Sequence, residues 1–137
     1  MNILVIDAQG GGVGRQLVSA IKRAIPSAAV MAVGTNSAAT SAMLRAGADH
    51  AATGENAIVV NCRRADVITG PIGIVIADAL WGEITPAMAA AVGQSPAARV
   101  LIPMNHCDNI VAGVSELSVG ALIQSAIDEI CRRAHCG

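Results

Sequence analysis

A run of aliphatic residues leads directly into a glycine-rich loop near the start of the chain. Residues 3–6 read Ile-Leu-Val-Ile, and residues 7–14 read Asp-Ala-Gln-Gly-Gly-Gly-Val-Gly. The aliphatic run is typical of a buried strand, and glycines let the backbone turn sharply and approach a ligand closely. The helix predicted to follow would point unpaired N–H groups and a partial positive charge at a phosphate. The pattern therefore predicts a parallel α/β fold that holds a nucleotide at this loop.

Composition supports one globular domain over residues 1–137. Hydrophobic residues make up 53% of the chain and charged residues 14%, which is enough apolar surface for a core. Phe and Tyr are absent and Trp81 is the single tryptophan, so no platform for base stacking is evident. The net charge of −1, without long charged runs, also argues against nucleic acid or a membrane as the partner.

The chain shows no sign of a targeting or membrane-spanning segment. Its longest apolar run, residues 72–77, is short and is interrupted by Asp78. The cysteines are scattered through a chain that needs no disulfides for stability. We therefore expect reduced thiols and a cytoplasmic location; the four cysteines are Cys62, Cys107, Cys131 and Cys136.

Short apolar runs alternate with helical patterns, which is typical of βαβ units around a parallel sheet. Further strands are predicted at residues 28–33, 49–53, 66–69, 100–102 and 110–114, and helices at 13–25, 37–45, 55–64, 86–92 and from a cap at Ser118 to 130. Residues 72–82 fit helix or strand, and a short buried helix is favoured. The predicted fold is a doubly wound, Rossmann-like parallel sheet in three layers, with strand order 3-2-1-4-5 and an added edge strand.

In such a sheet, ligands lie at the carboxyl ends of the strands, where the loops after the first, second and fourth strands converge. The glycine loop, residues 34–36 and residues 70–73 are these loops. We predict a cofactor-binding site there, and no catalytic residue is assigned. The predicted cofactor-binding residues are Gln9, Gly10, Gly11, Gly12, Val13, Gly14, Arg15, Thr35, Asn36, Gly70 and Pro71.

Residues 7–14 resemble the Thr-Gly-x-x-x-Gly-Ile-Gly loop of short-chain dehydrogenases, with Gly12, Val13 and Gly14 matching and Ala8 in place of the first glycine. The resemblance implies a pyrophosphate of NAD or NADP over residues 10–15, with Asp7 or Gln9 near the loop backbone. The catalytic Tyr-x-x-x-Lys motif of that family has no counterpart, because the chain lacks tyrosine and its one lysine lies at position 22. Dehydrogenase chemistry of that type is therefore excluded.

Two alternatives for the loop remain open. Residues 11–15 also resemble the Lys-Gly-Gly-Val-Gly-Lys loop of ParA- and MinD-type ATPases. In that comparison Arg15 replaces the phosphate-binding lysine and Gln16 replaces the hydroxyl that would bind magnesium, so two mechanistic parts are missing. The second alternative is that the glycines serve packing or another small ligand.

The whole chain resembles a small bacterial family of short Rossmann-like proteins without an assigned activity. The shared segments are Val-Ile-Asp-x-Gln-Gly-Gly-Gly at the start, and residues 34–36, 52–57, 70–73 and 82–88. The resemblance covers nearly the full length and implies the fold without a reaction. Ala8 replaces the glycine expected at its position, which a backbone turn tolerates when φ is negative.

The end of the second predicted strand bears on the choice of cofactor. An Asp or Glu is expected there when a site binds the ribose of NAD, but Thr35 and Asn36 occupy the place. Together with Ser37 they offer hydrogen bonds to a 2′-phosphate, which slightly favours NADP. Alternatively, Asn36 or Ser37 caps the following helix.

Other polar residues at strand ends support different functions. Glu55 and Asn56 would suit a small enzyme with a carboxylate base, as would Asn105 and His106; alternatively Glu55 compensates a helix dipole. His106 and Cys107, joined with a second loose cluster, would suit zinc or nickel in a metal-handling or scaffold protein, although the spacing matches no known metal motif. The second cluster consists of Cys131, His135 and Cys136.

Residues 72–81 and 86–92 supply more apolar surface than a connection between strands requires. Trp81 is the one large side chain that would anchor an interface, which predicts a homo-oligomer, most simply a dimer. Alternatively, both segments cover the sheet. The favoured interpretation is a nucleotide-binding protein, of the NAD(P) type, with a regulatory or redox-sensing role.

Overall fold

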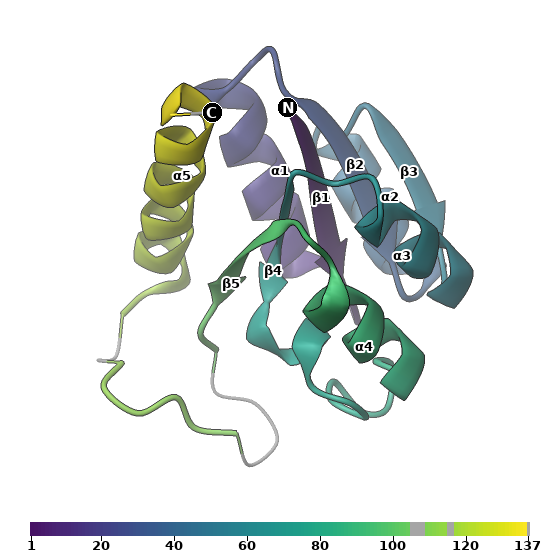
Figure 1. Ribbon diagram of the computed structural model, residues 1–137. Helices are drawn as coiled ribbons and strands as arrows, with labels where there is room; N and C mark the ends of the chain where they lie inside the picture. Colours follow the sequence, from purple (N-terminus) through teal and green to yellow (C-terminus); the bar gives the residue numbers. More distant parts are fainter. Residues whose placement is uncertain (105–108, 115–116, 137) are drawn as a thin grey trace.

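The computed structural model describes residues 1–104, 109–114 and 117–136, with side chains described up to Ala134. Five strands form one parallel sheet in the order β3-β2-β1-β4-β5 (Figure 1). This order confirms the predicted doubly wound topology. The strands are β1 (Asn2–Asp7), β2 (Ala29–Gly34), β3 (His50–Thr53), β4 (Val67–Pro71) and β5 (Ala98–Ile102).

Helices cover both faces of the sheet, which gives the three predicted layers (Figure 1). One face is covered by α1 (Gly12–Ala24), α2 (Ser37–Arg45) and α5 (Val119–Cys136). The opposite face is covered by α3 (Glu55–Cys62), the short 3₁₀ helix η1 (Ile72–Val75) and α4 (Pro86–Gln94). The right-handed crossovers expected between parallel strands account for this division.

The central strand explains the unbroken apolar run in the sequence. Ile3 and Val5 pack against the helices α1 and α5, whereas Leu4 and Ile6 pack against the other layer. Each of these four side chains is at most 1% exposed. A strand that is buried on both faces needs apolar residues at every position rather than at alternate ones.

The register brings the ends of three strands to one level. Asp7 pairs with Gly34, and Val5 pairs with Thr69, so the last residue of β4, Pro71, lies level with Asp7. The glycine loop, residues 34–36 and the start of η1 therefore meet at the carboxyl edge of the sheet. This is the convergence that the sequence predicts.

Several predicted helix ends are confirmed. The side chain of Asn36 accepts a hydrogen bond from Ala39 N at 2.9 Å and caps α2, and Ser118 Oγ accepts one from Ala121 N at 3.2 Å before α5. Gly47 follows α2 with φ +116°, as a C-terminal glycine should. The stripe of α5 that runs from Val119 to Ile130 packs on the sheet.

The predictions for irregular segments are confirmed only in part. The short buried helix expected within residues 72–82 is present as η1, a single turn whose Gly73 and Ile74 are buried, and it is followed by turns in which Asp78, Leu80 and Trp81 have positive φ. The predicted sixth strand at residues 110–114 is not a strand, because Gly113 adopts φ +82° within a turn. Gly70 and Pro71, predicted to close the fourth strand, instead form its last two residues.

Cys62 is buried and Cys131 is half-buried, and both are free thiols. Burial raises the pKa of the Cys62 thiol to about 11, so it is a structural group rather than a reactive one. Among the described helices, none has the length and apolar character needed to cross a membrane.

Candidate functional site

Two glycines of the first loop are required by the fold. Gly11 adopts φ +73° at the start of α1, and a Cβ on it would lie 2.9 Å from Ala39 Cα of α2. A Cβ on Gly14 would lie 2.6 Å from Met43 Sδ. Both positions let α1 pack closely against α2, so the packing interpretation of the loop holds for these two residues.

The buried carboxylate of Asp7 holds the loop from below. Its Oδ2 accepts a hydrogen bond from Gly14 N at 2.7 Å and its Oδ1 accepts one from Ala8 N at 2.8 Å. Because Gly11 has no side chain to cap α1, Asp7 supplies that acceptor from the end of β1. Burial raises the pKa of Asp7, although these N–H groups partly offset the effect.

Gly10 and Gly12 differ from the other two glycines. A Cβ on either residue would meet no atom within 4 Å, and neither residue has a positive φ. In the part of the chain that the structure describes, the N–H groups of both residues also have no hydrogen-bond partner. The loop therefore exposes backbone donors at the two positions where packing does not require glycine.

A cavity of about 180 Å³ adjoins these donors. Its walls come from residues 7–13, together with Pro71, Leu80 and Met104. This volume is below the range of about 300–1,000 Å³ that is usual for sites of complete small ligands, and the cavity opens at the carboxyl edge of the sheet.

Glu83 reaches the same edge from the turns between η1 and α4. Its Oε1 accepts hydrogen bonds from Thr35 Oγ1 and from Asn36 Nδ2, each at 2.7 Å. The backbone N–H of Gln9 donates to both oxygens, at 3.1 and 3.2 Å. Glu83 thus joins the loop after β1 to the loop after β2.

The charge of Glu83 is favoured by these partners. Partial burial would raise the pKa of its carboxyl, but the donors on Thr35, Asn36 and Gln9 outweigh that effect and hold the pKa below its ordinary value of 4.5. A second negative charge therefore stands near the glycine loop, and it contributes to the raised pKa of Asp7.

Thr35 and Asn36 occupy the predicted place but have other partners than predicted. Both donate to Glu83, and Asn36 Nδ2 also donates to Gln9 O at 3.0 Å. The interpretation of Asn36 as a helix cap is confirmed. With these donors occupied by a carboxylate, the argument that they receive a 2′-phosphate, and with it the slight preference for NADP, loses its basis.

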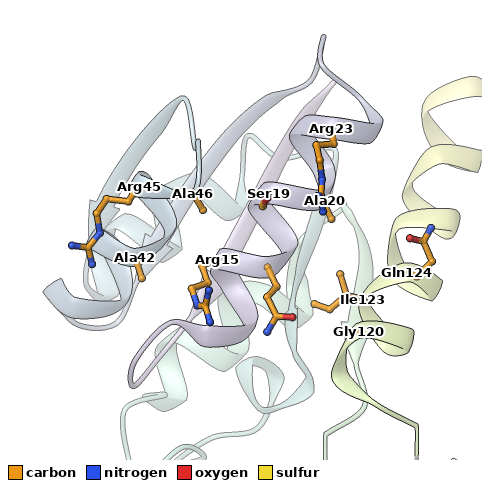
Figure 2. Close-up of a pocket in the computed structure, with 11 residues that line it drawn as sticks. Arg15, Ser19, Ala20, Arg23, Ala42, Arg45, Ala46, Gly120, Ile123 and Gln124 are labelled. Atoms are coloured by element: carbon orange, nitrogen blue, oxygen red, sulfur yellow. The ribbon is translucent and has the colours of Figure 1, made fainter.

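The remaining predicted site residues, Gly70, Pro71 and Arg15, lie in three different places. Pro71 lines the cavity at the glycine loop, whereas Gly70 is buried in β4, where a Cβ would lie 2.3 Å from Ile6 O. A separate open groove of about 570 Å³ lies between α1, α2 and α5, and Arg15, Arg23 and Arg45 are among the residues that line it (Figure 2). Arg15 is not among the residues that line the loop cavity.

The alternative sites receive little support from the described residues. Glu55 Oε1 accepts a hydrogen bond from Thr85 Oγ1 at 2.5 Å, so its carboxylate ties α3 to the residue before α4. No group of three potential metal ligands occurs among the described side chains. Asn105, His106 and Cys107 lie outside the described residues, and His135 and Cys136 lie beyond the described side chains.

Trp81 is 87% exposed, beside Gly82 in the turns that carry Glu83. The alternative interpretation, that residues 72–81 and 86–92 cover one face of the sheet, is confirmed, because both segments supply buried residues to the core on that face, among them Ile74, Leu80 and Val92. The homo-oligomer that Trp81 would anchor stays a prediction, which analytical ultracentrifugation would test.

Fold and site together define a Rossmann-like α/β protein with a glycine-rich loop at the carboxyl edge of its sheet. A family model described as "Domain of unknown function (DUF3842)" matches residues 2–135, and the chain belongs to this family. No curated protein matches it significantly. Among solved structures, the chain is similar to a dodecameric FMN-dependent UbiX-like decarboxylase from Escherichia coli O157:H7, with 15% identity, coverage of 98% of this chain and 94% of that chain, and a TM-score of 0.49.

Sequence reasoning missed three residues at this edge: Leu80, Glu83 and Met104. Glu83 lies within residues 82–88, one of the segments that carry the family resemblance, but it contacts Gln9 across 74 residues of sequence. Only the succession of left-handed residues before it brings it back over the sheet. An acidic residue in a glycine-containing turn was the one available signal.

Proposed function

We propose that this protein binds a nucleotide of the NAD(P) type, with the phosphates of the ligand over Gly10 and Gly12. The observation that carries the proposal is the coincidence at these two residues. Each has room for a side chain, no positive φ that demands glycine, and a backbone N–H without a partner in the described structure. A phosphate ester supplies the acceptors that such donors lack.

The position of the loop supports the same ligand class. It follows the central strand and opens toward the carboxyl edge, where open α/β sheets bind their ligands. The lining is mainly backbone and apolar, with Leu80 and Met104 beside the glycines. Such a surface holds a ligand without requiring a catalytic side chain, which suits a regulatory or redox-sensing protein.

The test is a thermal-shift titration against NAD, NADH, NADP, NADPH, FMN, ATP and GTP, each with and without a divalent cation. A ligand at about 100 times its dissociation constant stabilises the fold by about 2.7 kcal/mol, which is several degrees for a domain of this size. We expect at least one dinucleotide to raise the midpoint of unfolding. No response to any of the four dinucleotides would contradict the proposal.

A matched pair of variants locates the site. Gly12→Val places a side chain in the open space above the loop, where it should abolish the ligand-induced shift while the free protein stays folded. Gly93→Val makes the same change in α4, also in open space and without a positive φ, and should leave the shift unchanged. Equal loss of binding in both variants, or in neither, would count against a site at the glycine loop.

A further inference from the structure

A carboxylate stands at the end of β2 although the strand itself ends without an acidic residue. Gly34, Thr35 and Asn36 end the strand and begin the loop that follows it, and the acid that contacts this place is Glu83. Its partners Thr35 and Asn36 are the positions where the ribose-binding acid of a dinucleotide site is expected. Glu83 thus brings a negative charge to the end of β2 from the turns between η1 and α4, which follow β4 in the chain.

The two oxygens of Glu83 are unequally occupied. Oε1 accepts from Thr35, from Asn36 and, at 3.1 Å, from Gln9 N. Oε2 shares only the same Gln9 N–H, at 3.2 Å. A carboxylate oxygen has two lone pairs, so Oε2 keeps the capacity to accept a hydrogen bond from a hydroxyl group.

The segment that carries Glu83 is held in place before any ligand arrives. Asp78 N donates to Ile84 O at 2.7 Å, and Ile84 N donates to Ala79 O at 3.2 Å, so the turns close on themselves. At its end, Thr85 Oγ1 donates to Glu55. A carboxylate that is ordered in advance binds a hydroxyl pair with less loss of entropy than a mobile one.

We propose that Glu83 is the ribose-binding acid of this site, so that the protein selects a dinucleotide with a free 2′-hydroxyl, NAD, over its 2′-phosphorylated counterpart, NADP. The inference rests on the proposed function, since it assigns one contact within that site. Glu83 Oε2 accepts the hydroxyl hydrogen bonds, while a 2′-phosphate at the same place meets a like charge and finds the donors on Thr35 and Asn36 already occupied.

The experiment measures the dissociation constants of NAD and NADP by isothermal titration calorimetry for the wild type and for Glu83→Gln. We expect the wild type to bind NAD at least about tenfold more tightly than NADP, and the variant to bring the ratio close to one, mainly by weaker NAD binding. Because the ratio compares two ligands on one protein, a uniform loss of folded protein does not alter it.

Glu55→Gln is the matched control. It removes a carboxylate from the same edge and loosens the end of the same turns, but it leaves Glu83 and its partners intact. Its NAD to NADP ratio should equal that of the wild type. An equal change in both variants would mean that loop order, not the Glu83 carboxylate, sets the preference, and would overturn the inference.

The remaining outcomes separate this inference from the proposed function. If Glu83→Gln increases the affinity for NAD and for NADP by the same factor, the carboxylate opposes the binding of both ligands and the inference is wrong. If dinucleotides bind, and Gly12→Val abolishes binding, but the ratio stays constant in Glu83→Gln, the inference alone fails. If ATP or FMN binds and no dinucleotide does, the inference and the assignment of an NAD(P)-type ligand both fail, although a nucleotide site remains. If nothing in the panel binds, both fail.

Discussion

Asp7 and Glu83 both accept hydrogen bonds from the first loop, yet they have opposite environments. Asp7 is 5% exposed and takes N–H groups from Ala8 and Gly14 beneath the loop. Glu83 is partly exposed above it and takes donors from two loops. Burial raises the pKa of Asp7, whereas hydrogen bonds lower that of Glu83 despite its partial burial. Asp7 thus ties the start of α1 to the end of β1, whereas Glu83 joins the loop after β1 to the loop after β2.

The largest effect should follow from Asp7→Ala. The change leaves the N–H groups of Ala8 and Gly14 buried without an acceptor, at a cost of about 3 kcal/mol in the free energy of unfolding. Urea denaturation would measure it. Asp66→Ala is the control, because Asp66 accepts one exposed backbone N–H, from Asn2 at 2.7 Å, and its loss should cost less than about 1 kcal/mol. Similar losses in both variants would refute a special role for Asp7.

The two kinds of glycine in the loop should respond differently to alanine. Gly14→Ala forces a Cβ to within 2.8 Å of Asp7 Cβ, and we expect a destabilisation of about 2 kcal/mol. Gly10→Ala meets no neighbour within 4 Å and should change the stability by less than about 0.5 kcal/mol. Thermal unfolding of the pair would measure this contrast, and equal midpoints would show that the loop is not divided in this way.

Thr69 extends the comparison to a buried hydroxyl for which the described residues provide no hydrogen-bond partner. The residue is fully buried in β4, and within the described structure its Oγ1 makes no hydrogen bond. Thr69→Val should therefore stabilise the fold by about 1 kcal/mol. Thr40→Val is the opposite case, since that hydroxyl donates to Asn36 O at 3.0 Å, and it should destabilise. A loss of stability in Thr69→Val would indicate that the hydroxyl has a partner.

The smallest effects concern pH. The pKa of Glu83 lies below its ordinary 4.5 in the folded chain, so its contribution is complete above that value and is lost as the pH falls through the folded pKa. The pKa of Asp7 is raised above 3.8, so the folded state is favoured below that value and this gain is lost as the pH rises through the folded pKa.

Stability measured against pH for the wild type, Glu83→Gln and Asp7→Asn would separate the two carboxylates. The advantage of the wild type over Glu83→Gln, under about 1 kcal/mol, should shrink on acidification, because the carboxyl is partly exposed. As the pH is lowered, the wild type should gain stability relative to Asp7→Asn. The same slope for both carboxylates would contradict their opposite pKa shifts.

The topology could be predicted from the sequence because it depends on local patterns. The apolar run of β1 and the stripe of α5 each define a buried element, and few arrangements of alternating strands and helices obey right-handed crossovers. The prediction of a sixth strand at residues 110–114 was wrong because the apolar residues there surround Gly113, whose φ of +82° is typical of a turn. Apolar composition alone does not distinguish a strand from an apolar turn.

The candidate site could be predicted only in part. The glycine loop and the level strand ends follow from local sequence, but the sequence does not indicate which glycines serve packing, since that depends on contacts of Gly11 and Gly14 with α2. The resemblance to dehydrogenase loops implied a pyrophosphate over residues 10–15, and the sequence could not indicate that Arg15 also lines the groove between α1, α2 and α5 (Figure 2). Glu83 needs a chain path through Asp78, Leu80 and Trp81, three left-handed residues, and leucine and tryptophan seldom adopt a positive φ.

The exposed indole of Trp81 provides an intrinsic fluorescence probe for ligand binding near Glu83. The chain has one tryptophan and no tyrosine, so all of its near-ultraviolet emission comes from a point two residues before Glu83. Since the ring is 87% exposed in the single folded chain, unfolding of a monomer should change its emission little, whereas dissociation of an oligomer that Trp81 anchors should change it clearly. A ligand that binds beside Glu83 would therefore change the tryptophan fluorescence directly. No label is needed, because the chain contains no other aromatic residue that contributes to the signal.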